Sequence, residues 1–150
     1  MQRNSTEGSG KTHGGPERCV LVADDDAAFR ADLCGYLRDL GLRVVEAENG
    51  LAALEAIERF EPCVVFLDVR MPGMDGISVA ERAESLSPET KVVVMSGYTD
   101  EIRRSHLANR ANTGAFWVIE KPFPLRIVGK FAQDICCGRA PTGGVRQRAA

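Results

Sequence analysis

Short runs of β-branched and apolar residues alternate along the chain with longer amphipathic stretches. The apolar runs occupy residues 19–23, 42–46, 63–67, 91–95 and 116–119. The middle runs read as continuously apolar, which favours strands that helices cover on both faces. This alternation predicts βα units and a five-stranded parallel sheet, so the expected fold class is α/β with three layers.

The stretches between these runs carry apolar residues at helical spacing. The first stripe comprises Phe29, Leu33, Leu37 and Leu40, and Gly41 follows it at the position of a helix C-terminal glycine. Three further stripes comprise Leu51, Leu54, Ile57 and Phe60, then Ile77, Ala80 and Ala83, and finally Leu125, Val128, Phe131, Ala132 and Ile135. A helix at about 100–110 completes a set of five. Its sizeable apolar residues are only Ile102 and Leu107, so we expect it to be the least firmly packed.

The two ends of the chain lack this periodic pattern. Residues 1–17 and 138–150 are rich in glycine and polar residues, and they offer too little apolar surface to offset the entropy of ordering. We therefore expect one folded domain at 18–137 between a flexible N-terminal tail and a flexible C-terminal tail.

The composition limits the kinds of molecule that the protein is expected to bind. The formal net charge of −2 over 150 residues provides no basic field for nucleic acid or anionic lipid. The N-terminus is polar where a secretory signal needs an apolar stretch, and no apolar run is long enough to span a membrane. We expect a cytoplasmic protein that binds neither nucleic acid nor membrane.

The five cysteines are odd in number and show no C-x-x-C spacing. They are Cys19, Cys34, Cys63, Cys136 and Cys137. In a reducing compartment this pattern favours reduced structural thiols over a zinc site or a redox pair.

Polar residues follow directly after four of the apolar runs. They are Asp24, Asp25 and Asp26 after the first, Asp68 after the third, Ser96 after the fourth and Lys121 after the fifth. The carboxyl ends of parallel strands share one edge of a sheet, so these groups should meet in one crevice. Clustered carboxylates repel one another unless a cation is present, and Mg²⁺ prefers such oxygen ligands. An Asp beside such an ion can act as a nucleophile toward phosphorus.

Four segments of the chain resemble the signature blocks of response-regulator receiver domains. They are VLVADDD at 20–26, VVFLDVRMPGMDG at 64–76, VVVMSGY at 92–98 and EKPF at 120–123. The resemblance covers most of the chain, and the D-x-x-M-P-x-M-D-G block is its most specific part. It implies a flavodoxin-like doubly wound fold with the strand order 2-1-3-4-5.

The resemblance also implies a role for each matching residue. Asp68 matches the phosphoacceptor. Asp24 and Asp25 match the acidic pair that holds Mg²⁺ or Mn²⁺, with Asp25 the more direct ligand, and the backbone carbonyl of Arg70 would complete the protein's share.

Two further matches lie after the fourth and fifth strands. Ser96 matches the hydroxyl that bonds to the new phosphoryl oxygen. Lys121 matches the lysine that pairs with the acceptor and then with the phosphate, and a cis bond to Pro122 is implied.

Such a domain is the substrate of a histidine kinase or a phosphotransfer protein. We expect it to be no enzyme beyond self-catalysed phosphoryl transfer to its own Asp and slow self-dephosphorylation. With no output domain in 150 residues, it would signal through the surface of the fourth helix, fifth strand and fifth helix, or relay its phosphoryl group. It would be a monomer or a phosphorylation-dependent dimer.

We expect several other polar residues to have structural roles or to lie on the surface, outside the functional site. We expect Asp26 and Asp75 to cap helices, because Asp is favoured at helix N-termini. His13 lies in the expected tail, and His106 has no acidic neighbour in sequence, so both are interpreted as surface residues. The segment 8–12 departs from the phosphate-binding loop pattern and follows no strand.

Receiver domains usually carry Tyr or Phe three residues before the lysine, where this chain has Val118. The usual readout of phosphorylation is therefore in doubt, although the chemistry should survive. Trp117 should point to the other face of the sheet by strand alternation. Arg70 and Tyr98 stand where they could shield the phosphoryl group from water, which suggests slow dephosphorylation.

Two other functional classes remain. One is a receiver-like scaffold that binds partners without phosphorylation, which Val118 favours and the complete set of acidic and basic residues opposes. The other is a phosphatase of the haloacid-dehalogenase type. Such phosphatases need a second Asp two residues after the nucleophile, where this chain has Arg70.

Overall fold

The computed structural model describes residues 18–97, 116–141 and 146–147 of the chain. Its elements follow the order β1 Val20–Ala23, α1 Ala27–Asp39, β2 Val44–Ala47, α2 Gly50–Phe60, β3 Val64–Asp68, α3 Gly76–Leu86, β4 Lys91–Ser96, β5 Phe116–Glu120, α6 Leu125–Cys136 and β6 Arg146–Gln147. The strands form one sheet in the order β2-β1-β3-β4-β5-β6. The first five are parallel, and β6 pairs antiparallel with β5.

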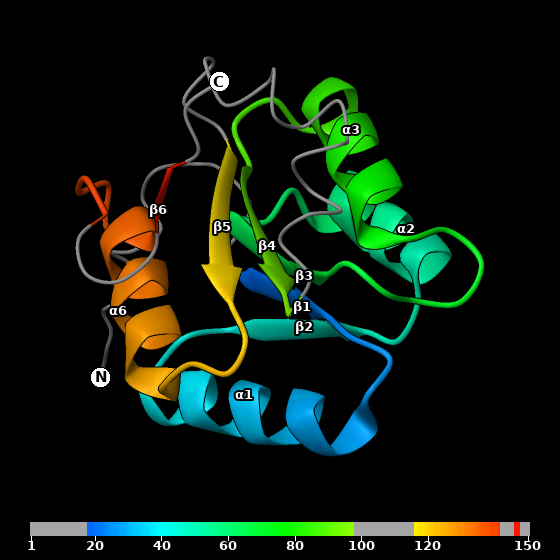
Figure 1. Ribbon diagram of the computed structural model, residues 1–150. Helices are drawn as coiled ribbons and strands as arrows, with labels where there is room; N and C mark the ends of the chain where they lie inside the picture. The colour runs from blue at the N-terminus through cyan, green and yellow to red at the C-terminus, as the bar shows by residue number, and fades with distance from the viewer. Residues whose placement is uncertain (1–17, 98–115, 142–145, 148–150) are drawn as a thin grey trace, which may run out of the picture.

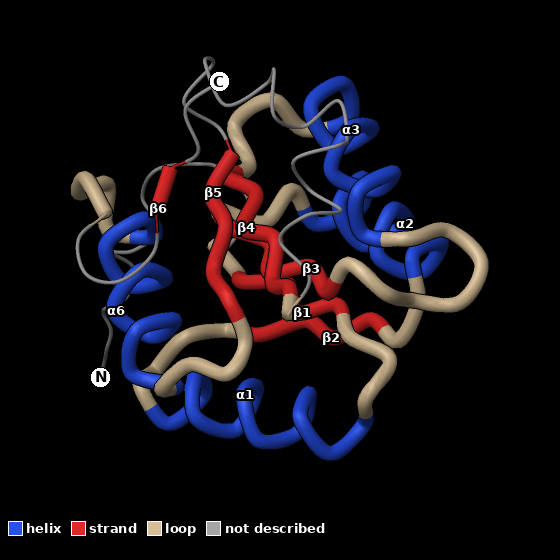
Figure 2. Tube along the Cα trace, in the orientation of Figure 1, coloured by secondary structure: helices blue, strands red, loops and turns tan. Residues whose placement is uncertain are grey.

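The sheet lies between two layers of helices (Figures 1 and 2). Helices α1 and α6 cover one face, and α2 and α3 cover the other. Alternate residues of each strand point to opposite faces, as strand geometry requires. In β1, for example, Leu21 joins the core under α2 and α3, whereas Val20 and Val22 join the core under α1 and α6.

Side chains with a carboxylate or amide begin three of the helices. Asp26, Asn49 and Asp75 each accept a hydrogen bond from the backbone N–H three residues later. These bonds satisfy amide groups that have no partner within the helix. The expected capping roles of Asp26 and Asp75 are therefore confirmed. Gly41, which follows α1, adopts a φ of 88°, as expected for a helix C-terminal glycine.

The predicted fold class is confirmed, including the strand order 2-1-3-4-5 and the three layers. The short sixth strand was not predicted, and it places Arg146 and Gln147 beside Val118 and Trp117. The helix expected at about 100–110 lies outside the described residues. The expected tails and the domain limits at 18 and 137 stay predictions. Among the described helices, none combines the length and the apolar character that crossing a membrane requires.

The prediction of five reduced thiols is wrong for two of the cysteines. Cys63, which precedes β3, and Cys136, at the end of α6, form a disulfide although they are 73 positions apart in sequence. Their Cα atoms lie 5.7 Å apart, within the range that a disulfide can bridge. The pairing depends on where α6 packs against the sheet, which cysteine spacing does not reveal.

Candidate functional site

Three carboxylates meet at the carboxyl edge of the sheet. Asp24 follows β1, Asp25 lies beside it, and Asp68 ends β3, the strand next to β1. One oxygen from each lies within 4.8 Å of the other two. Asp24 is fully buried, Asp68 is partly buried and Asp25 is exposed. The sequence prediction that these acids converge is therefore correct.

Lys121 joins this cluster from the end of β5. Its Nζ donates to Asp24 Oδ2 at 3.0 Å and to Asp68 Oδ1 at 3.3 Å. Its backbone N–H donates to the carbonyl of Ser96 at 3.0 Å, which ties the loop after β5 to the end of β4. The peptide bond from Lys121 to Pro122 is cis, as the sequence resemblance implies.

The environment shifts the pKa values of both Asp68 and Lys121. Burial raises the pKa of Asp68, and the negative charges of Asp24 and Asp25 raise it further, while Lys121 opposes the change. For Lys121, burial disfavours the ammonium, but hydrogen bonds and charges from Asp24 and Asp68 outweigh it and raise the pKa. At Asp68, burial and the neighbouring carboxylates together outweigh the effect of Lys121, so an added positive charge would stabilise the ionised form.

The ring of Phe29, which packs against Phe123, contacts the ammonium of Lys121. The ammonium lies 4.5 Å from the centroid of the Phe29 ring, and Phe29 packs edge to face against Phe123 at 5.9 Å between centroids. A cation over an aromatic face is attracted by the electron-rich ring. Phe29 appears in the sequence only as one position of an apolar helical stripe, so its contact with Lys121 could not be inferred from that pattern.

Arg30 fixes the loop that carries the acidic pair. Its guanidinium donates to the backbone carbonyl of Asp24 and forms an ion pair with Glu46 of β2 at 3.1 Å. Arg38 bonds to the other oxygen of Glu46 at 3.1 Å. This chain of contacts anchors the turn after β1 to α1 and β2, and sequence analysis missed it because no motif marks it.

Gly76 allows α3 to begin directly against Asp68. A Cβ atom on Gly76 would lie 2.1 Å from the backbone oxygen of Asp68, where no side chain can fit. The Gly76 N–H donates to the carbonyl of Val69 at 2.9 Å, which holds the helix start against this loop. The Asp75-Gly76 pair is the sequence signal for this feature.

Ser96 and Arg70 occupy neighbouring parts of the edge. Ser96 ends β4 and is buried, whereas Arg70 is exposed in the loop after β3. A pocket of about 430 Å³ opens beside that loop, lined by Asp25, Val69, Arg70, Met71, Pro72, Asp75 and Ile77. The structure thus leaves space next to the carboxylates on the side of Asp25.

Two neighbouring residues of β5 lie as the sequence predicts. Trp117 and Val118 face opposite sides of the sheet, as strand alternation predicts. Val118 is buried in the core under α2 and α3. His13, Tyr98 and His106 lie outside the described residues, so their predicted roles are untested.

Comparison with known proteins assigns the family. A model of the response regulator receiver domain matches residues 20–130 of the chain. The chain belongs to this family. The segments that carry the match include the ends of β1, β3, β4 and β5, where the polar cluster lies.

Relatives of this receiver domain include proteins with different architectures. It is 32% identical over 108 residues to the sporulation initiation phosphotransferase F of Bacillus subtilis, covering 71% of this chain and 83% of the relative. It is 35% identical over 106 residues to the autoinducer 1 sensor kinase/phosphatase LuxN of Vibrio campbellii, covering 71% of this chain but only 12% of the relative.

A solved receiver structure has the same fold. The receiver domain protein (CheY-like) of Methanospirillum hungatei is 27% identical, with a TM-score of 0.65. The match covers 79% of this chain and 94% of that chain.

The donor set of this receiver domain suits a hard divalent cation. Asp24, Asp25 and Asp68 offer oxygen ligands, and such ligands are preferred by Mg²⁺ and Mn²⁺. Burial and the neighbouring carboxylates raise the pKa of Asp68, so a bound cation would favour its ionised form. The residues present therefore fit a metal ion of this class.

Proposed function

We propose that this receiver domain accepts a phosphoryl group on Asp68 from a histidine kinase or a phosphotransfer protein. The observation that carries the proposal is the convergence of Asp68 with two further carboxylates and the ammonium of Lys121. In this arrangement the nucleophile lies beside an ammonium and beside carboxylates that could hold a cation, and both positive charges would neutralise a phosphoryl group. The family membership and the phosphotransferase among its relatives support the same function.

In the proposed reaction, a carboxylate oxygen of Asp68 forms a bond to phosphorus, and the bond from phosphorus to the donor atom breaks. Asp24 and Asp25, with the Arg70 carbonyl, would hold Mg²⁺ or Mn²⁺ together with Asp68. The bound ion supplies positive charge to the phosphoryl oxygens. Lys121 already contacts Asp68 and would pair with the phosphate, and the Ser96 hydroxyl would donate to one of its oxygens.

We place this chemistry in the cytoplasm, without a nucleic-acid or membrane partner. The domain would act as a monomer or a phosphorylation-dependent dimer, by docking to a target protein or by relaying its phosphoryl group. Val118 fills the position of the usual switch aromatic and is buried, so the readout would depend on other residues.

Incubation with acetyl phosphate and Mg²⁺ tests this function. We expect a mass gain of one phosphoryl group in the native chain and none in Asp68→Asn. Asp75→Asn is the matched control, because Asp75 lines the same pocket but caps α3. A phosphatase would release phosphate without a lasting mass gain, and a scaffold would show neither effect; either result contradicts the proposal.

The exposed Arg70 beside the carboxylates provides a prediction about the lifetime of the phosphorylated form. Because Arg70 can shield the phosphoryl group from water, we expect a half-life well above seconds and a severalfold shorter one in Arg70→Gly. Loss of the phosphoryl mass with time measures both. A half-life of seconds in the native chain would contradict the prediction.

A further inference from the structure

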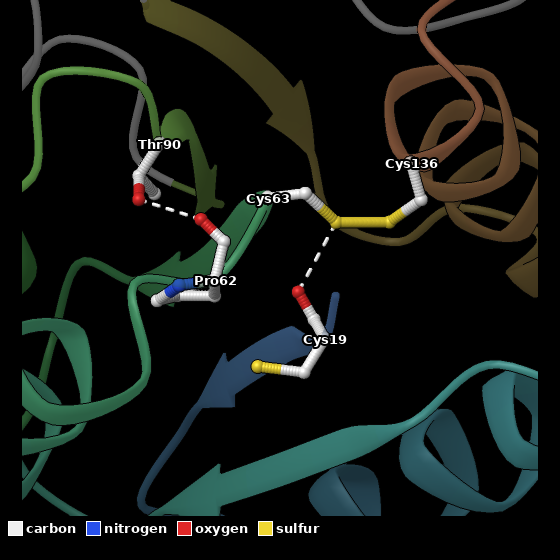
Figure 3. The surroundings of a disulfide bond; sticks show 5 residues. All are labelled: Cys19, Pro62, Cys63, Thr90 and Cys136. Carbon is white, nitrogen blue, oxygen red and sulfur yellow. Dashed lines mark hydrogen bonds between the residues drawn. A yellow bond between two sulfur atoms is a disulfide. The ribbon is translucent and has the colours of Figure 1, made fainter. Parts of the chain in front are cut away.

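The disulfide lies at the edge of the sheet opposite to the carboxylate cluster. Cys63 lies directly before β3 and Asp68 is the last residue of that strand, so the length of β3 separates them. Figure 3 shows the bond running from Cys63 to Cys136 on α6, beside the backbone of Cys19. Neither cysteine has a role in the proposed phosphoryl transfer.

The surroundings of Cys63 also suit a free thiol. Its sulfur lies 3.1 Å from the carbonyl oxygen of Cys19, which already accepts the backbone N–H of Cys63 at 2.9 Å. When the disulfide is broken, the Cys63 S–H can donate to this oxygen without any movement of the backbone. The buried sulfur thus has an acceptor in the reduced form and a covalent partner in the oxidised form.

Cys136 gives a reductant access to the bond. It is partly exposed at the last position of α6, and Cys137 and Gly138 after it are exposed. Cys63 is buried, with 8% of its surface exposed. An incoming thiolate can therefore reach the sulfur of Cys136 more readily than that of Cys63.

Helix α6 is held against the sheet by buried apolar side chains as well as by the disulfide. Val128, Phe131 and Ala132 are fully buried against the sheet, and Phe131 makes edge-to-face contacts with Phe66 and Trp117. This buried apolar surface stabilises the position of the helix in addition to the bond. The bond can thus be made and broken in the folded protein.

We propose that Cys63 and Cys136 form a site of reversible oxidative modification that responds to dithiol reductants and to disulfide oxidants. In reduction, a thiolate of the dithiol attacks Cys136, forms a mixed disulfide and expels the Cys63 thiolate, which takes up a proton. The second thiol of the reductant then attacks the reductant sulfur that is bonded to Cys136. This step forms the disulfide within the reductant and releases Cys136 as a thiol. Two electrons and two protons pass to the protein, and the dithiol becomes a disulfide.

The two buried free cysteines are poorly suited to this exchange. Cys34 is buried in α1, and its burial raises the pKa of the thiol to about 11, so little thiolate is present at neutral pH. Cys19 is buried at the start of β1. Cys137 is exposed but lies outside the disulfide. The exchange should therefore leave Cys19 and Cys34 unchanged.

Peptide mapping of the folded 150-residue chain tests the proposal. The native protein is equilibrated with dithiothreitol or with glutathione disulfide, quenched in acid, alkylated in denaturant and digested. We expect the peptide that links Cys63 to Cys136 to disappear with dithiothreitol and to return with glutathione disulfide. Circular dichroism should show a folded protein in both states.

Three variants identify the residues involved. Cys63→Ser should abolish the linked peptide, whereas Cys34→Ala and Cys137→Ser should leave its formation unchanged. The site is refuted if glutathione disulfide never produces the linked peptide. It is equally refuted if dithiothreitol removes the bond only in denaturant, because the disulfide would then be permanent, or if Cys137→Ser abolishes the linked peptide.

Discussion

Phe29 shows how one core residue can take part in a polar site. Its ring faces the Lys121 ammonium, and the partly buried side chain also packs against the core under α1 and α6. Cation–π contacts of this kind contribute about 0.5–2 kcal/mol. The ring therefore helps to hold the ammonium beside Asp24 and Asp68.

Replacing Phe29 by Leu should preserve the apolar contact and remove the ring. We expect the pKa of Lys121 to fall, because the charged form loses the stabilisation that the ring provides. NMR titration of the lysine side chains in metal-free buffer measures this. Phe60→Leu, on the opposite face of the sheet, is the control, and an unchanged Lys121 pKa in Phe29→Leu would contradict the prediction.

Ionised Asp68 lowers the stability of the folded protein, and replacing it by the neutral amide Asn should remove this effect. Its pKa is raised in the folded protein above the ordinary value of 3.8, so ionised Asp68 destabilises the fold at neutral pH. We expect Asp68→Asn to unfold at a higher temperature than the native chain in buffer containing a chelator. The difference should shrink as the pH falls through the raised pKa and vanish below 3.8, where Asp68 is protonated in both states.

Added Mg²⁺ provides the complementary measurement for Asp68. A cation bound by the three carboxylates should raise the unfolding temperature of the native chain. The increase should be much smaller in Asp68→Asn, which lacks one of the carboxylates. Equal effects of Mg²⁺ on both proteins would show that the ion binds elsewhere.

At the scale of elements, the start of α3 sets the position of the strand end that carries Asp68. The close approach of Gly76 to the Asp68 carbonyl excludes a side chain there. Gly76→Ala should lower the free energy of unfolding by about 1–3 kcal/mol or more, as overpacked sites do. Denaturant unfolding measures the change.

Gly35 is the matched control for this substitution. It lies within α1, and a Cβ atom there meets nothing within 4 Å. Gly35→Ala should stabilise the protein by about 0.5–1 kcal/mol, because alanine restricts the unfolded chain more than glycine. If both variants were equally destabilised, the contact with Asp68 would not be the cause.

The whole molecule shows which features can be inferred from a sequence pattern. Alternating apolar runs predict the parallel strands, and the polar residues that follow them predict the convergence of Asp24, Asp68 and Lys121. Those features depend on local periodicity and on one rule of parallel sheets. The fold and the acidic cluster therefore follow from short stretches of sequence.

Other features depend on packing between distant segments and carry no local signal. Arg146 and Gln147 lie in a polar stretch without strand alternation, so β6 was not predicted. The pairing of Cys63 with Cys136 and the contact of Arg30 with the Asp24 carbonyl require the three-dimensional arrangement. Side-chain contacts across elements are thus the part that sequence reasoning does not supply.

The sheet divides the interior into two cores that share strands but not side chains. Val79 of α3 is buried on one side and Val128 of α6 on the other. Substituting either by Ala should cost about 1–3 kcal/mol. In the double variant the two costs should sum to within about 0.5 kcal/mol, as is usual for sites without common neighbours.

Urea unfolding of the single and double variants checks this additivity, and a coupling well above that margin would contradict it. Independent cores have a practical consequence for anyone engineering this domain. The face under α2 and α3 can be repacked, for instance to gain heat resistance, while the helices on the other face and the disulfide keep their native surroundings.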